Sequence, residues 1–142
     1  IFDQPTKIIL GNFKKSKNNN KLFANNAKII IGSRLSAKKT ENLEYIEYKG
    51  KNFLGKFLQD LLARDISSIL VEGGQKTLNT FITNNLFDEL VIYTAPIFLG
   101  DASIETLSLK APKSIKQSTR LNKVKIERFK DDVKTTYYNA NI

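Results

Sequence analysis

The feature that most constrains the fold is a short apolar run that ends in a carboxylate and two glycines. Residues 68–71 read SILV, a run typical of a buried parallel strand, and Glu72 and Gly73-Gly74 follow it directly. Residues 77–84 then place apolar side chains at helical spacing over about two turns. A strand, a glycine turn and a helix in this order predict an α/β sheet with Glu72 at the carboxyl end of a strand.

Patterns elsewhere in the chain predict a second helix and more strands. Apolar residues at helical spacing predict a helix over 53–62. Apolar or alternating runs that end at turn residues predict strands over 7–10, 27–31, 43–48, 89–94, 114–122, 123–129 and 133–138, with Asp131-Asp132 as the clearest turn. We therefore expect an α/β fold with one mixed sheet, parallel through residues 68–94 and antiparallel in its C-terminal strands, with flanking helices.

Composition limits the chemistry that the chain can carry. It has no Cys and no His among 142 residues, which excludes disulfides, Cys–His and Ser–His–Asp nucleophilic catalysis and His-rich metal sites. No apolar run approaches the roughly 20 residues of a membrane-spanning helix, and the first residues lack a signal-peptide pattern. Because the absence of Cys suits a reducing compartment, we expect a cytoplasmic protein.

Charge and the lack of methionine bear on partners and on completeness. The net charge is +9, and the basic residues concentrate toward both ends of the chain. This is typical either of a Lys- and Asn-rich surface without a specific partner or of a protein whose partner carries phosphate. A complete reading frame begins with Met, and the chain contains none, so we expect a piece of a larger protein.

The glycine turn at residues 72–74 has two interpretations. Glycine permits positive φ and close approach of another group, and the following helix offers free N–H groups and a partial positive charge, so the turn can cradle a phosphate beside a carboxylate. Alternatively, Gly-Gly is only a tight connection between a strand and a helix. The turn alone does not decide between the two.

Four stretches of the sequence resemble one known family. Residues 71–74 read V-E-G-G, residues 86–90 read L-F-D-E-L, residues 95–100 read A-P-I-F-L-G, and residues 4–10 read Q-P-T-K-I-I-L. In this order and spacing they are similar to motifs of the C-terminal reductase domain of the bifunctional riboflavin biosynthesis deaminase/reductase. The resemblance covers most of the chain and is sharpest over residues 69–100.

The resemblance implies a dihydrofolate-reductase-like fold and an enzyme that uses NADPH to reduce the ribosyl group of 5-amino-6-(5-phosphoribosylamino)uracil to a ribityl chain. It implies that residues 1–142 are the C-terminal part of the reductase domain, without its upstream part and without a deaminase domain. It also implies a homodimer formed through this domain. Such a reaction needs no Cys, His or metal from the protein, because the cofactor carries the reactive hydride.

The resemblance also assigns site residues by position. Glu72 falls on a substrate-contacting carboxylate. The positions that fall on cofactor-binding residues are Asn12, Gly74, Gln75, Lys76, Thr77, Leu78, Asn79 and Thr80. The sequence departs from the family at Gln75-Lys76, where a hydroxyl donor is missing and Lys76 offers a cation for phosphate. It also departs at Gly11-Asn12, which replaces Asp-Ser.

Several roles stay open. Glu72 either accepts hydrogen bonds from the substrate, which we favour, or donates a proton to the reduced oxygen. Arg34 follows the second predicted strand, where it either pairs with the 2′-phosphate of NADPH or faces solvent. Three alternatives to the leading function remain: another dihydrofolate-reductase-like NADPH reductase, a role in assembly alone, and a basic nucleic-acid-binding module. The last is disfavoured because the basic residues fall in predicted loops without aromatic interleaving.

Overall fold

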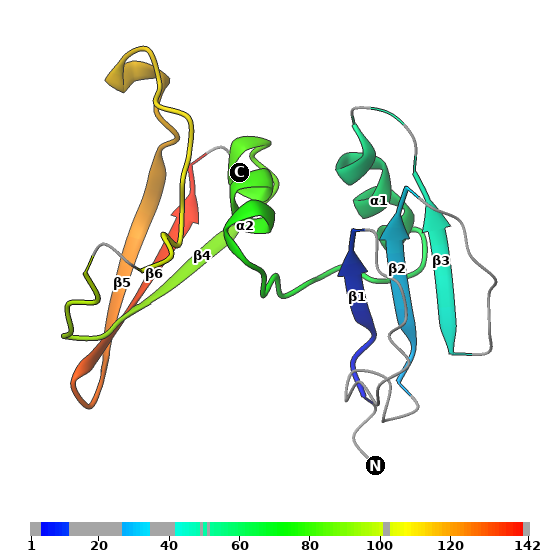
Figure 1. The fold of residues 1–142 in the computed structure, drawn as a ribbon, viewed down its shortest axis with the longest axis horizontal. Coiled ribbons are helices and arrows are strands. Elements are labelled where there is room, and N and C mark those ends of the chain that lie inside the picture. Colours follow the sequence, from blue (N-terminus) through cyan, green and yellow to red (C-terminus); the bar gives the residue numbers. More distant parts are fainter. Residues whose placement is uncertain are drawn as a thin grey trace. The chain divides into compact units, whose positions relative to one another are not determined.

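The computed structural model describes residues 4–11, 27–34, 42–48, 50, 52–100 and 103–140. The chain forms two compact units, Ile1–Ile69 and Leu70–Ile142. In the described residues each unit contains a three-stranded sheet and an α-helix (Figure 1). The α/β class predicted from the sequence is confirmed.

The first unit is built on a parallel sheet. Its strands are β1 (Lys7–Leu10), β2 (Ile29–Ser33) and β3 (Leu43–Glu47), in the order β1-β2-β3. The central strand β2 is buried along its whole length. Helix α1 (Phe53–Leu62) follows the sheet with the bounds predicted from its apolar spacing. The predicted strand 27–31 begins two residues later than expected and runs on to Ser33.

Helix α1 covers one face of this sheet, and Gly32 makes the close approach possible. The core joins Ile30 of β2 to Phe57 and Leu61 of α1, all at most 1% exposed. A Cβ at position 32 would lie 2.7 Å from the Phe57 ring, and Phe57 is too buried to move away. Only glycine therefore lets the aromatic ring pack directly on the backbone of β2.

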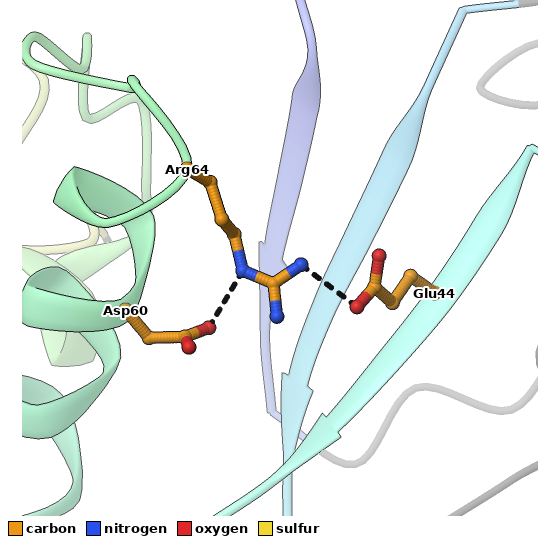
Figure 2. Close-up of polar contacts among 3 residues, drawn as sticks. All are labelled: Glu44, Asp60 and Arg64. Carbon is orange, nitrogen blue, oxygen red and sulfur yellow. Dashed lines mark hydrogen bonds and ion pairs between the residues drawn. The ribbon is translucent and has the colours of Figure 1, made fainter.

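A charged group fixes the end of α1 to β3. The Arg64 guanidinium, just beyond α1, donates from Nη1 to Glu44 Oε1 at 2.7 Å and from Nε to Asp60 Oδ2 at 2.8 Å (Figure 2). Glu44 pairs with Ile30 in the sheet register, so its side chain lies on the face that α1 covers. The planar fork of arginine suits two carboxylates at once.

The second unit is built on an antiparallel sheet. Its elements are α2 (Gln75–Thr83), β4 (Glu89–Thr94), the 3₁₀-helix η2 (Ile115–Gln117), β5 (Leu121–Phe129) and β6 (Asp132–Asn139). The strands lie in the order β4-β6-β5. The hairpin between β5 and β6 turns at Lys130 and Asp131, with Lys130 in the left-handed region at φ 58°. The turn therefore lies one residue earlier than the predicted Asp131-Asp132.

The connection from α2 to β4 is held by asparagine side chains. Asn85 has φ 55°, and its N–H and that of Leu86 close the last turn of α2 on Ile82 O and Phe81 O. The buried Asn139 at the end of β6 donates from Nδ2 to Asn85 Oδ1 and to Phe87 O. These contacts tie the last strand to the end of the helix.

Two predicted strands are absent, and the sheet pairing differs from the prediction. Residues 68–71 form no strand, because no described strand pairs with their backbone. Leu70 in this segment is 86% exposed. The parallel pairing involves β1, β2 and β3 rather than residues 68–94, and β4 is antiparallel and largely exposed. Residues 114–122 form η2 and only the start of β5, because the Ser118 and Gln117 N–H groups close a local turn.

The helices are short. None in the described part of the chain has the length and apolar character to cross a membrane.

Candidate functional site

The turn at residues 72–74 leads directly into α2 and is open to solvent. Glu72, Gly73 and Gly74 are all exposed, and Gly74 is the N-cap residue with an extended backbone at φ −73° and ψ 172°. No side chain caps the helix, and its first turn contains no acidic residue. The Thr77 N–H donates to Gly74 O at 2.9 Å, but the N–H groups before it at the start of the helix have no intrahelical acceptor, so this turn presents free donors and a partial positive charge.

The two glycines have different structural reasons, and neither is the positive φ that the sequence suggested. Left-handed glycines in the described residues are Gly11, Gly50 and Gly100. A Cβ on Gly73 would lie 2.7 Å from Thr77 Cβ, so packing against α2 requires glycine there. A Cβ on Gly74 would meet nothing within 4 Å. The fold therefore gives no packing reason for Gly74, and the space beside its backbone is free for another group.

The residues that follow in the helix divide between exposed and internally bonded side chains. Lys76 is exposed in the first turn, where a cation opposes the helix dipole unless it meets an anion. The Thr80 hydroxyl donates to Lys76 O at 2.7 Å and so is used within the helix. Thr77 and Leu78 are half-buried. Of these four, Lys76 has the side chain best suited to meet a phosphate.

Gln75 and Asn79 have partners that sequence reasoning missed. Gln75 Nε2 donates to Glu105 O at 3.0 Å. Asn79 Nδ2 donates to Ser108 O at 2.9 Å, and Asn79 Oδ1 accepts from Ser108 N at 3.1 Å. Because these bonds go to the backbone of residues 105 and 108, the side-chain sequence of that segment carried no signal for them.

The remaining predicted site residues are Asn12, Arg34 and Glu72. Asn12 lies outside the described residues. Arg34 directly follows β2 and is exposed at the carboxyl edge of the parallel sheet. Glu72 is exposed next to the glycines, but it follows an extended segment rather than a strand. The predicted roles of these three residues stay predictions.

The turn can accept an anionic ligand. Free helix N–H groups, the open space at Gly74 and the exposed Lys76 suit a phosphate group. In the part of the chain that the structure describes, no group of three His, Cys, Asp or Glu side chains is arranged to hold a metal.

Comparisons with known proteins converge on one family. The model of the RibD C-terminal domain matches residues 3–135. The riboflavin biosynthesis protein RibD of Haemophilus influenzae is 28% identical over 137 residues, a match that covers 94% of this chain and 37% of that protein. This chain therefore spans well under half the length of that curated relative.

Solved structures share the fold. RibD from Acinetobacter baumannii matches with a TM-score of 0.78 and 18% identity, over 96% of this chain and 38% of that chain. The diaminohydroxyphosphoribosylaminopyrimidine deaminase/5-amino-6-(5-phosphoribosylamino)uracil reductase from Thermotoga maritima matches with a TM-score of 0.72 and 20% identity, over 96% and 38%.

Proposed function

Because this chain belongs to the RibD C-terminal domain family, we propose that it is part of an NADPH-dependent reductase of riboflavin biosynthesis. The Thermotoga relative is named as a 5-amino-6-(5-phosphoribosylamino)uracil reductase, and we assign the same substrate to this chain. NADPH, when bound, supplies a hydride that together with one proton reduces the ribosyl group to ribityl and leaves NADP⁺. The protein has to bind and orient both molecules.

The turn before α2 is our proposed contact for the cofactor. Its free N–H groups and the exposed Lys76 would hold the diphosphate, and the open space at Gly74 would let the cofactor approach the backbone. Glu72, adjacent and exposed, would accept hydrogen bonds from the substrate.

The observation that carries this proposal is Gly74 together with the family match. Glycine is accepted at an N-cap, but no contact within the fold requires it at position 74. The open space beside its backbone lets a ligand approach the turn closely. The match over residues 3–135 supports a role in riboflavin biosynthesis, and we infer from it that the ligand is a nicotinamide dinucleotide.

We extend the proposal to organisation and location. We propose that residues 1–142 form the C-terminal part of a reductase domain, that the protein is a homodimer through this domain, and that it works in the cytoplasm. The sheet β4-β6-β5 supports the second point, because Val124 and Ile126 of β5 are 57% and 67% exposed on one face. Apolar side chains exposed together in this way are typical of association surfaces.

Titration with reduced nicotinamide dinucleotides tests the proposal. In the protein expressed from its complete natural reading frame, we expect NADPH to bind at least about tenfold more tightly than NADH, because the 2′-phosphate adds charge-assisted hydrogen bonds. Adding 5-amino-6-(5-phosphoribosylamino)uracil should then consume NADPH and yield the ribityl product. Absence of NADPH binding, or binding without reduction of this substrate, would contradict the proposal.

A further inference from the structure

We propose that Gln75 and Asn79 are positioning residues that tie residues 103–109, here called the strap, to the first turns of α2 and thereby shape one side of the nucleotide site. This inference rests on the proposed function. It differs from the role that the family resemblance gave these two residues, which was direct contact with the cofactor. The strap is drawn in yellow in Figure 1.

The contacts are specific and run along one side of the helix. Gln75 and Asn79 are four residues apart, so their side chains project from the same face of α2. Gln75 reaches Glu105 O at 3.0 Å, and Asn79 makes both a donor and an acceptor bond to the backbone of Ser108. The carboxamide of Asn79 thus pairs with Ser108 as a neighbouring strand would.

Little else holds the strap. Of the described residues 103–117, Leu107 is half-buried and all the others are exposed, although Leu109 keeps only 43% of its surface accessible. The other hydrogen bonds of the described residues in this stretch are local, such as those that Ser103 donates to Gly100 O. With so little buried apolar surface, the position of the strap in the described structure depends on the two amide side chains.

These hydrogen bonds place the strap beside the proposed nucleotide site. Gln75 is the first residue of α2 and directly follows Gly74, so the strap reaches the first turn of the helix. It occupies the side of α2 that carries residues 75 and 79. Lys76, one position further around the helix, stays exposed. A dinucleotide at the turn would therefore meet Lys76 and the free N–H groups on one side and the strap on the other.

Hydrogen exchange at Ser108 tests the tether directly, because that N–H is the donor to Asn79 Oδ1. In Asn79→Ala we expect exchange of the Ser108 amide to become about two- to tenfold faster, and in Asn79→Asp, which keeps the acceptor, to stay close to the native rate. Asn84→Ala is the matched control, since Asn84 Nδ2 bonds only within α2, to Thr80 O. Ser108→Ala should also be neutral, because the contact is to the backbone.

The role in the site is tested by titrating NADPH into the same variants of the protein expressed from its complete reading frame. We expect Asn79→Ala and Gln75→Ala to weaken NADPH binding by about two- to tenfold, with melting temperatures equal to that of Asn84→Ala. Equal exchange rates of the Ser108 amide in Asn79→Ala and Asn84→Ala would show that Asn79 does not hold the strap. Faster exchange with unchanged NADPH affinity would overturn its role in the site. If the unaltered protein fails to bind NADPH at all, the proposed function itself is wrong, which separates the two failures.

Discussion

At the scale of single residues, the two adjacent glycines differ in the space around them. Gly73 is needed because Thr77 of α2 occupies the space where a Cβ would lie, at 2.7 Å. Gly74 has room for a side chain and backbone angles that any residue adopts. Packing therefore requires the first glycine, whereas the second is one of several residues accepted at an N-cap and leaves room for our proposed ligand.

This difference predicts opposite effects on stability. Gly73→Ala should lower the free energy of unfolding by about 1–3 kcal/mol, because the new methyl group collides with Thr77. Gly74→Ser should raise it by a few tenths of a kcal/mol, because serine at an N-cap accepts a hydrogen bond from a free helix N–H. Chemical denaturation measures both changes.

The same serine should weaken NADPH binding by about tenfold or more, since it fills the space at Gly74 and uses a donor intended for phosphate. A more stable protein with poorer binding is an outcome that general damage to the fold cannot produce. Unchanged NADPH affinity in Gly74→Ser would show that the cofactor does not approach this turn.

At the scale of elements, the end of α1 is joined to β3 by a polar cluster in which Tyr48 takes part. The Tyr48 ring packs edge-on against Phe57, with 5.3 Å between the ring centroids. Its hydroxyl is buried near Asp60, one of the two carboxylates that Arg64 contacts (Figure 2). Burial, and then the negative charge of Asp60, raise the pKa of Tyr48 to about 12 from an ordinary 10.0. The hydroxyl forms no well-aligned hydrogen bond, so Asp60 acts mainly as a nearby charge.

This shift predicts a loss of stability in alkali. Because the pKa of Tyr48 is higher in the folded state than in the unfolded chain, its contribution is complete below about pH 10 and is lost as the pH rises toward 12. Tyr48→Phe cannot ionise and should show a shallower decline of the free energy of unfolding over that range. Tyr45→Phe, on the strand β3 that ends just before Tyr48, is the control. Equal declines in the native protein and Tyr48→Phe would contradict the prediction.

Some helices and strands could be predicted from the sequence alone, and others could not. The bounds of α1, β1 and β4 were predictable because each is a regular apolar pattern that ends at a strong turn signal or a loss of periodicity. Residues 68–71 have an equally clear apolar pattern, yet a strand also needs a partner, which no local pattern reveals. For the same reason the pairing of Asn79 with Ser108 could not be predicted, since it joins a side chain to a distant backbone.

The candidate site was predictable only in part, through its motif. The sequence located Glu72-Gly73-Gly74 before a helix, and the structure confirms the helix and the exposure of the turn. Of the two reasons predicted for the glycines, positive φ was wrong, because neither has it, whereas close approach of another group is confirmed at Gly73. Whether a position needs glycine depends on the side chains around it, and for Gly73 the deciding side chain is Thr77, four residues further along the chain.

At the scale of the whole molecule, the sheet β4-β6-β5 exposes apolar side chains on both faces. On one face lie Val124 and Ile126 of β5, 57% and 67% exposed. On the other face Glu127 lies between Lys125 and Lys134, at 3.0 and 3.3 Å, and the exposed rings of Tyr93 and Phe129 pack with 6.2 Å between their centroids. The face with Val124 and Ile126 is our proposed surface for a second copy of the chain.

The two faces allow a matched test of association. Burying one isoleucine contributes roughly 1.5–3 kcal/mol, and a twofold dimer buries each residue twice. Ile126→Lys should therefore raise the dimer dissociation constant by about a hundredfold or more, whereas Lys125→Gln, its neighbour on the opposite face, should leave it nearly unchanged. Sedimentation velocity over a range of concentrations measures both. A native protein that stays monomeric at every concentration would show that this chain does not dimerise. A lysine at position 126 could not be buried in a dimer interface without a partner for its charge. An Ile126→Lys variant that dimerises like the native protein would therefore show that a different surface joins the copies.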